Sequence, residues 1–349
     1  MLVAMKELKP MPTSRQHQLI NWLEPWLTEP ASTQPTLVAG DASFRSYYRL
    51  AAEQNRLGSN LIVMDAPPEK ESSQRFIQLA LSWHQQGLRV PYLYSSCEHQ
   101  GFALLEDFGD QQLMQAVKPL AAAEADAYYL QALTQLAELQ SVPVADLPLY
   151  SQELLNQEIQ LFEHWLIDQL LQIQGLPTGW DAFKQRLVET ALEQPQTLVH
   201  RDYHSRNLMV TEQNQLGILD FQDAVLGPCT YDAVSLIRDC YLEWPQNWQQ
   251  HWLQAFQQQT YAHISRERFE YWFDWMGMQR HLKAAGIFAR LCLRDNKKSY
   301  LQDLPLTLKH LQAALKKYPE AADILSWIEQ SVEPAVSHYL AQQAQNPET

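Results

Sequence analysis

The sequence predicts an α+β protein of two lobes: a small first lobe with a five-stranded antiparallel sheet, and a larger, mainly helical second lobe. Three observations predict this class. The chain has 349 residues, of which 46% are hydrophobic, so it exceeds one average domain and can bury a large core. Short apolar runs fill the first third, and longer amphipathic patterns fill the rest. One pair of short apolar runs interrupts the helical part.

In the first lobe, apolar runs of strand length occur at residues 37–39, 47–50, 61–64, 92–94 and 102–105. The run 61–64 is apolar throughout, as expected for a buried central strand. Residues 71–86 predict a helix, because Phe76, Leu79, Ala80 and Trp83 share one face. An earlier short helix is expected from His17 to Leu27. We therefore place an N-terminal tail at 1–12, the first lobe at 13–108 and a hinge at 106–110.

The second lobe, 109–349, shows helical periodicity over residues 121–140 and again from Trp275 to Arg294. A further helix is expected to begin after Ser151, which can cap it. The exception is the segment 198–221. There, apolar runs at 208–210 and 216–219 flank a polar stretch at 211–215, which predicts a hairpin. Tryptophans spaced four apart (248 and 252) and three apart (272 and 275) favour helix packing over sugar stacking.

Composition excludes several classes of protein. The formal charge of −14 argues against non-specific nucleic-acid binding, which requires a basic surface. No apolar run is long enough to cross a membrane or to form the core of a signal peptide. The four cysteines show no CxxC spacing, which indicates a reduced protein without a structural zinc site. We expect a cytoplasmic monomer with no nucleic-acid or membrane partner.

The strongest chemical signal is His200-Arg201-Asp202 followed, after four residues, by Asn207. This is the spacing of a kinase catalytic loop. Phosphoryl transfer needs positioning and charge neutralisation, so Asp202 is expected to orient the acceptor hydroxyl and take its proton. Asn207 offers a neutral oxygen to Mg²⁺. His200 is expected to shape the loop by hydrogen bonding to the backbone.

A second carboxylate follows the predicted hairpin, in Asp220-Phe221-Gln222-Asp223. A hairpin returns the chain on itself, so Asn207 before it and Asp220 after it can hold one metal ion, which Asp220 would bridge to the phosphates of ATP. Singly, each of these residues is also compatible with an ordinary loop or turn position. The joint spacing favours the catalytic interpretation.

The loop from Gly40 to Ser46 lies between two predicted strands and is a candidate phosphate lid. Ser43 and the backbone of Phe44 are expected to contact phosphate oxygens, and Arg45 to supply positive charge. The loop contains a single glycine, so its composition alone does not distinguish a phosphate lid from an ordinary hairpin loop.

Around this cluster, Gly227-Pro228 and Tyr231-Asp232 complete a set that resembles the aminoglycoside phosphotransferase/choline kinase superfamily, with its protein-kinase-like fold. Gly40-Asp41-Ala42-Ser43-Phe44-Arg45, the run 63–68, and the helix segments 279–283 and 286–290 are most similar to the anomeric kinases of cell-wall recycling. The resemblance implies ATP-dependent, Mg²⁺-assisted phosphorylation of the C1 hydroxyl of N-acetylmuramic acid or N-acetylglucosamine. It also implies that the backbone at Glu106, Asp107 and Phe108 meets the adenine.

One residue departs from the pattern of the superfamily. Most relatives have a lysine in the third strand that holds the α- and β-phosphates, but here the strand ends in Asp65. Lys70 or Arg45 is a possible substitute, with Glu69 or Glu71 as its partner.

On the acceptor side, five side chains are candidates for contacts to the sugar: His204, Asp223, Arg280, Lys283 and Arg290. The three cations suit a lactyl carboxylate, because a guanidinium can bind a carboxylate with two hydrogen bonds. Two alternatives stay open. An antibiotic-modifying phosphotransferase would need an acidic acceptor site, and a non-catalytic nucleotide-binding protein would explain the missing lysine.

Overall fold

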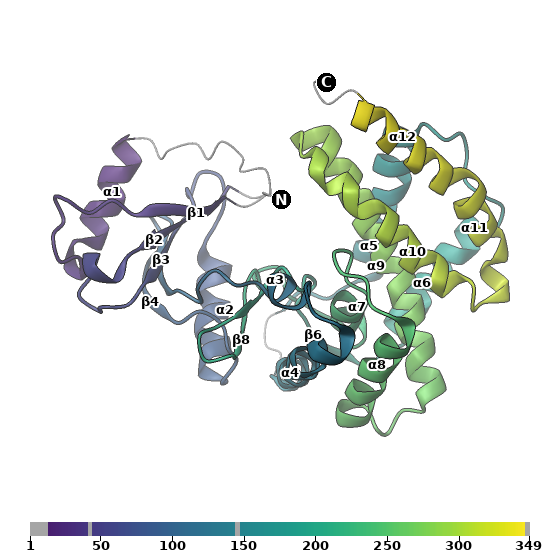
Figure 1. Ribbon diagram of the computed structural model, residues 1–349, viewed down its shortest axis with the longest axis horizontal. Helices are drawn as coiled ribbons and strands as arrows, with labels where there is room; N and C mark the ends of the chain where they lie inside the picture. Colours follow the sequence, from purple (N-terminus) through teal and green to yellow (C-terminus); the bar gives the residue numbers. More distant parts are fainter. Residues whose placement is uncertain (1–12, 41–43, 144–146, 346–349) are drawn as a thin grey trace. The chain divides into compact units, whose positions relative to one another are not determined.

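The chain divides into two compact units, Met1–Asp110 with Met209–Gln222, and Gln111–Leu208 with Asp223–Thr349. The computed structural model describes residues 13–40, 44–143 and 147–345 (Figure 1). The predicted tail 1–12 lies outside these residues, as does Ser43 of the predicted phosphate lid.

The first unit contains the predicted five-stranded sheet, in the order β1-β2-β3-β5-β4 with every neighbouring pair antiparallel. Its strands are β1 (Thr36–Gly40), β2 (Ser46–Leu50), β3 (Leu61–Asp65), β4 (Leu93–Cys97) and β5 (Phe102–Glu106). The apolar run 61–64 forms the central strand, where Val63 lies opposite Tyr48 on one side and Leu104 on the other. The fold-class prediction is therefore confirmed for this lobe.

Two helices accompany this sheet, α1 (Thr13–Leu23) and α2 (Gln74–Gln85). Leu19, Leu23 and Leu27 pack with Leu50 and Phe102 in a buried cluster, which seats α1 on the sheet. Of the predicted face of α2, Phe76, Ala80 and Trp83 are buried, and Leu79 is partly exposed.

The predicted hairpin is present as β7 (Leu208–Val210) and β8 (Leu216–Ile218). It groups with the first unit, unlike the predicted boundary, which assigned everything after 108 to the second lobe. Packing explains the difference. The Ile218 N–H donates to the Arg89 carbonyl at 2.8 Å, and the Phe221 ring stacks on Phe76 with centroids 5.0 Å apart. A Cβ at Gly217 would lie 2.3 Å from the Phe108 ring, so only glycine allows this approach.

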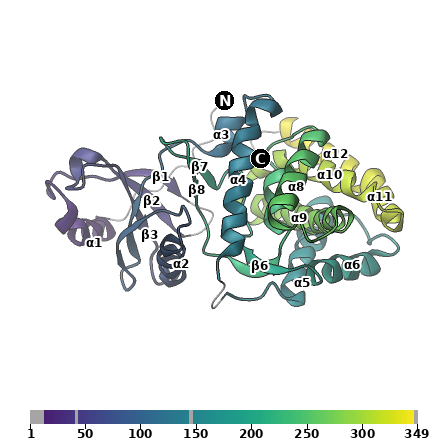
Figure 2. The same ribbon diagram turned by 90° about the horizontal axis from the view of Figure 1, so that it is seen from below.

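The second unit is mainly helical (Figure 2). Its helices are α3 (Leu113–Val117), α4 (Ala122–Ser141), α5 (Gln152–Leu161), α6 (Trp180–Leu192), α7 (Tyr231–Ile237), α8 (Gln246–Thr260), α9 (Arg266–Asp295), α10 (Leu304–Leu315), α11 (Ala322–Trp327) and α12 (Glu333–Gln345). Helix α9 is central to the unit and packs against α5, α6, α7, α8 and α10. Strands β6 (Gln196–Val199) and β9 (Val225–Pro228) form a separate antiparallel pair.

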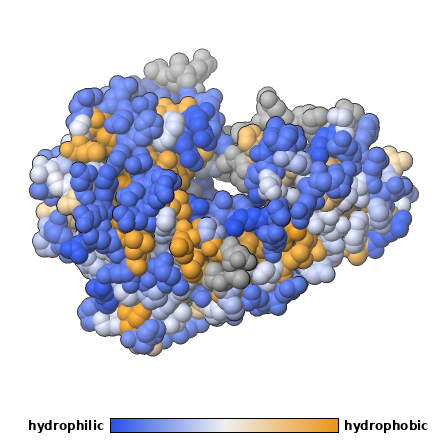
Figure 3. Space-filling view, turned by 180° about the vertical axis from the view of Figure 1, so that it is seen from behind, coloured by the Kyte–Doolittle hydropathy of each residue, from blue (hydrophilic) through white to orange (hydrophobic). Residues whose placement is uncertain are grey.

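The surface is mixed in character. Figure 3 shows hydrophilic residues over most of the visible face of each unit, with hydrophobic residues in smaller groups between them. Among the described residues, no helix is both long and apolar enough to span a membrane.

Ser151 caps α5 as predicted, and its side chain accepts from the Leu154 N–H at 3.2 Å. After this cap, Leu155, Ile159, Phe162 and Leu166 follow at helical spacing on one face, and all four are fully buried. The α-helix does not continue through this face, however, because residues 162–171 form a π-helix. The change begins where Gly286 of α9 meets the chain, since a Cβ at Gly286 would lie 2.3 Å from the Leu161 carbonyl carbon.

We expect Gly286→Ala to destabilise the second unit by about 1–3 kcal/mol, because the added methyl meets main-chain atoms that have no rotamer to adjust. Urea unfolding monitored by tryptophan fluorescence measures the loss. Gly277→Ala on the same helix is the control. Its Cβ would meet side-chain atoms alone, with the end of the Arg238 side chain nearest at 3.2 Å and a Val234 methyl next at 3.6 Å, and alanine is the better helix former. Equal effects of the two changes would contradict the packing argument.

Candidate active site

A pocket in the second unit contains the predicted base. Its lining residues come from the catalytic loop, the α7 region and α9: Asp202, His204, Tyr231, Cys240, Tyr241, Arg280, Lys283, Ala284, Ile287 and Phe288. The space between these side chains, with the solvent at its open mouth included, is about 400 Å³. Four of the predicted residues, Asp202, His204, Arg280 and Lys283, are thus brought together.

The backbone of the catalytic loop is fixed by a buried carboxylate. Asp232, on α7, accepts from the N–H groups of His200 at 2.7 Å and Arg201 at 3.1 Å. Burial raises the pKa of Asp232 to about 6, so it is ionised at neutral pH and can accept both bonds. His200 shapes the loop from within, because its Nδ1 accepts from the Asp202 N–H at 3.2 Å. Arg201 has a φ of 76°, a left-handed conformation that these bonds hold in place.

Asp202 lines the pocket and is partly exposed. Its carboxylate makes no hydrogen bond to any residue that the structure describes, so both oxygens can meet an incoming hydroxyl. Burial by itself would raise the pKa of Asp202, but the charges of Lys283 and, to a smaller degree, Arg280 hold it below its ordinary value. The carboxylate is therefore an ionised hydrogen-bond acceptor.

Asn207 is oriented by the same loop. Its amide nitrogen donates to the Asp202 carbonyl at 3.0 Å, which turns the amide oxygen to the opposite side of the side chain. That oxygen is a ligand type that Mg²⁺ accepts.

His204 is a neutral member of the pocket. Burial lowers the pKa of His204 to about 4, so the imidazole carries no charge at neutral pH. Its ring lies against Tyr241, with centroids 5.2 Å apart.

Beneath the loop, a second carboxylate binds several donors. Glu158, on α5, is 4% exposed. Its Oε1 accepts from Arg201 at 2.5 Å and from Lys283 at 3.0 Å. Its Oε2 accepts from the Tyr150 hydroxyl and from Gln279 at 3.2 Å. One buried carboxylate thus links the arginine of the catalytic loop to a lysine of the pocket.

The first unit holds the other predicted residues. Arg45 is 4% exposed and pairs with Glu71 at 2.5 Å. Burial lowers the pKa of Arg45, but Tyr47, Glu71 and Asp220 outweigh it and keep the pKa above its ordinary value. Lys70 instead lies 5.3 Å from the centroid of the exposed Phe44 ring. Of the two possible cations, Arg45 is therefore the one with the carboxylate partner.

Asp65, where the lysine was expected, has a structural partner. The Arg15 guanidinium of α1 pairs with it at 2.5 Å and lies 4.0 Å from the Phe102 ring centroid. This ion pair ties α1 to the end of β3.

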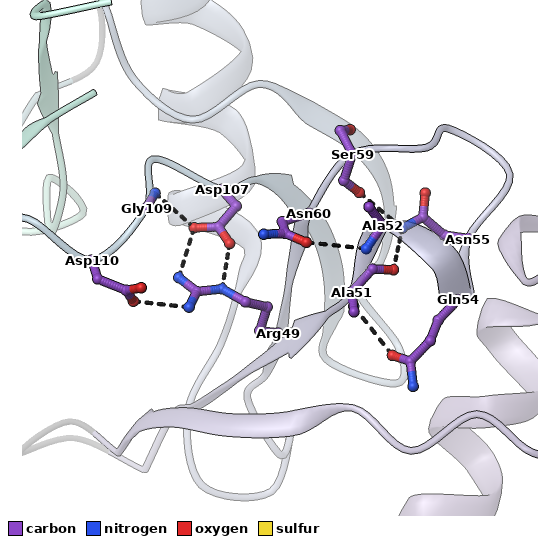
Figure 4. A network of polar contacts seen from close by, with 10 residues as sticks. All are labelled: Arg49, Ala51, Ala52, Gln54, Asn55, Ser59, Asn60, Asp107, Gly109 and Asp110. Atoms are coloured by element: carbon purple, nitrogen blue, oxygen red, sulfur yellow. Dashed lines mark hydrogen bonds and ion pairs between the residues drawn. The ribbon is translucent and has the colours of Figure 1, made fainter. Parts of the chain in front are cut away.

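Side chains at the hinge are held by two arginines. Arg49 of β2 binds Asp107 at 2.5 and 3.1 Å and Asp110 at 2.8 Å (Figure 4). Asp107 also accepts from the Gly109 N–H at 2.8 Å. Arg89 binds Glu106 through two bonds of 2.6 Å and covers the Phe108 ring. In the segment that the sequence predicts as a hinge, the carboxylates of Glu106 and Asp107 are therefore each held by an arginine of the same unit.

Residues 35–272 of the chain match the phosphotransferase enzyme family. The chain belongs to this family. As a family member it uses a nucleotide as phosphoryl donor, and the prediction of a phosphotransferase is confirmed.

Curated relatives cover nearly the whole chain. An N-acetylmuramate/N-acetylglucosamine kinase from Pseudomonas putida is 36% identical over 329 residues, which are 89% of this chain and 94% of that protein. The enzyme of the same name from Pseudomonas aeruginosa is 38% identical over 335 residues, 89% of this chain and 95% of that protein. The predicted resemblance to these kinases is confirmed.

Solved structures show the fold. A choline/ethanolamine kinase family protein from Mesorhizobium loti has a TM-score of 0.59 at 12% identity and covers 92% of this chain and 99% of its own. An ADP-bound aminoglycoside phosphotransferase has a TM-score of 0.56 at 14% identity, and the match covers 86% of this chain and 98% of that one. The two-lobed, kinase-like α+β fold predicted from the sequence is therefore confirmed.

Two predicted acceptor contacts of this phosphotransferase lie away from the pocket. Asp223 is exposed, and Arg290 is only partly buried on α9; neither lines the pocket. Arg290 is ten residues beyond Arg280, which places it about 15 Å further along the axis of α9.

Sequence reasoning assigned no role to two buried carboxylates that bind the loop, Asp232 and Glu158. Asp232 carried a signal, since it belongs to the pair Tyr231-Asp232 quoted for the resemblance. Glu158 also had one, because it falls beside Leu155 and Ile159 on the apolar face of the predicted helix. A charged residue there is buried and needs partners.

Proposed function

We propose that this phosphotransferase transfers the γ-phosphoryl group of ATP to the anomeric C1 hydroxyl of N-acetylmuramic acid and N-acetylglucosamine, in the recycling of cell-wall sugars. The observation that carries the proposal is the identity of 36–38% to kinases named for these two sugars, along 94–95% of their length. The pocket beside Asp202 supports it, because its polar side chains suit a small hydroxylated acceptor.

In the proposed mechanism, the sugar occupies this pocket with its C1 hydroxyl hydrogen-bonded to Asp202. The carboxylate orients the oxygen towards the phosphorus and accepts the proton as the new O–P bond forms, while the bond between the γ-phosphorus and the β–γ bridging oxygen breaks and ADP leaves. A hemiacetal hydroxyl is more acidic than an ordinary alcohol. Asp202 can therefore accept its proton even though the pKa of Asp202 lies below the ordinary value. His204, Arg280 and Lys283 line the same pocket and are proposed to surround the sugar.

Asn207 and Asp220 are the proposed ligands of Mg²⁺. Asn207 immediately precedes β7, and Asp220 follows β8 two residues after its end. Both offer oxygen, which suits a hard cation. The Gln222 amide donates to the Asp220 carboxylate at 2.7 Å and helps to orient it. Bound there, Mg²⁺ would neutralise the phosphate charge.

On the donor side, Arg45 is proposed to take the place of the strand lysine. Its pairing with Glu71 reproduces the usual cation–glutamate pair from a position at the start of β2. Ser43 and the backbone of Phe44 are proposed to contact phosphate oxygens, and the backbone at Glu106–Phe108 to contact adenine. The protein is proposed to act in the cytoplasm as a monomer.

A substrate panel with ATP and Mg²⁺ tests the proposal. We expect turnover of N-acetylmuramate and N-acetylglucosamine and none of kanamycin, choline or homoserine. Phosphorus NMR of the product should show a glycosyl phosphate. Addition of EDTA should abolish turnover, and excess Mg²⁺ should restore it. Rapid turnover of kanamycin without either amino sugar would reject the assignment and favour an antibiotic-modifying enzyme.

A further inference from the structure

The two buried cations of the acceptor pocket differ in their partners. Arg280 and Lys283 lie three residues apart on α9 and are 5% and 6% exposed. Both line the pocket with Asp202. One has a carboxylate partner within the protein, and the other has none among the described residues.

Lys283 is the paired cation. Its ammonium donates to Glu158 at 3.0 Å and to the Tyr231 hydroxyl at 2.9 Å. A ligand carboxylate that approached Lys283 would have to share it with the buried charge of Glu158, and two carboxylates at one cation repel each other. Through Glu158, Lys283 is also connected to Arg201 of the catalytic loop.

Arg280 is bonded only to neutral groups. Its Nε donates to the Ser235 hydroxyl at 2.5 Å, and its Nη1 lies 3.5 Å from the Cys240 sulfur. The nearby carboxylate of Asp239 instead accepts from the Ser205 N–H and hydroxyl and from the Tyr241 N–H. In the part of the chain that the structure describes, Nη2 of Arg280 has no hydrogen-bond partner.

We infer that these cations have separate tasks: Arg280 binds the carboxylate of a charged acceptor, and Lys283 is a positioning residue that holds Tyr231 and the Glu158–Arg201 pair beneath the catalytic loop. The inference rests on the proposed function, and it names Arg280 as the residue that distinguishes an acidic sugar from a neutral one. N-acetylmuramate carries a lactyl carboxylate, whereas N-acetylglucosamine carries a hydroxyl at that position. A buried guanidinium hydrogen-bonded to neutral groups is suited to the first.

The test pairs a charge change in the protein with a charge change in the ligand. Wild type, Arg280→Met and Arg280→Lys are assayed with N-acetylmuramate, its methyl ester and N-acetylglucosamine. We expect Arg280→Met to lower kcat/KM for the acid on the order of 10- to 100-fold, chiefly through KM. For the ester and the neutral sugar the loss should stay below about 3-fold. Arg280→Lys should recover part of the affinity for the acid.

Lys283→Met gives the contrasting result. We expect it to lower kcat for all three acceptors by a similar factor and to leave their KM ratios unchanged, because Lys283 supports the loop and is proposed to meet no part of the sugar that differs among the three. Lys283→Arg, which keeps the charge, should restore part of kcat. Arg268→Met, an exposed arginine on α9 that pairs with Glu193, is the matched control for loss of one positive charge.

Three results would overturn the inference: equal losses for acid, ester and neutral sugar in Arg280→Met, a selective loss of the acid in Lys283→Met, or no recovery in either conservative variant. Calorimetric binding of N-acetylmuramate and its ester without ATP tests the same contrast independently of turnover. If wild type binds the acid more tightly than the ester but phosphorylates neither, the proposed function fails and the assignment of Arg280 stands.

Discussion

Asp202→Asn should lower kcat by about 10²- to 10⁴-fold, the usual range for loss of a general base. The amide has the same shape as the carboxylate but cannot accept the proton of the C1 hydroxyl. Because the Asp202 carboxylate bonds to no described side chain, the change should leave the loop intact. Steady-state assays of ADP release with N-acetylmuramate and N-acetylglucosamine measure the effect.

The control for this prediction is nucleotide binding. Asp202→Asn should bind ATP with the affinity of the wild type and should keep the circular dichroism spectrum of the folded wild type. Asp181→Asn, at a fully exposed position on α6, should keep the wild-type kcat. A kcat for Asp202→Asn within threefold of the wild-type value would contradict the assignment of Asp202 as the base.

Glu158→Ala should destabilise the second unit by about 3–5 kcal/mol. It removes the only carboxylate that the described structure pairs with Lys283 or Arg201, and both side chains are largely buried. Breaking a buried pair costs this much because the remaining charges stay uncompensated. Urea unfolding followed by tryptophan fluorescence reports the loss, since Trp180, Trp252 and Trp275 are buried in the same unit.

Glu153→Ala is the matched control, since Glu153 is an exposed glutamate on the same helix and should cost no more than about 0.5 kcal/mol. Glu158→Gln keeps the shape and should be less destabilising than Glu158→Ala, but it should lower kcat because it weakens the hold on Arg201. A Glu158→Ala protein as stable as Glu153→Ala would show that the buried ion network does not stabilise the unit.

Much of the fold could be predicted because hydrophobic periodicity reports local structure directly. The run 61–64 became the central strand, and the serine at 151 became a helix cap. The same periodicity could not predict the π-helix at 162–171. That change coincides with the contact between Gly286 and the backbone at Leu161, which lies 125 residues away in the sequence.

The unit that contains the hairpin also could not be read from the sequence. The apolar runs at 208–210 and 216–219 predicted the hairpin itself. They could not predict which other residues of the chain the hairpin packs against. Contacts with Arg89, Phe108 and Phe76 group it with the first unit.

By itself, the sequence determined the reaction class. Asp202, Asn207 and Asp220 lie within one loop and the hairpin that follows it, so their spacing is a local pattern that can be recognised without the tertiary structure. It also determined that a strand lysine is missing. Only the tertiary structure decided which distant charged residues pair with one another. Arg45 rather than Lys70 meets Glu71, and Glu158, 44 residues before Asp202, lies beneath the catalytic loop. Ion pairs between distant residues depend on how helices and strands pack, and periodicity carries no information about that.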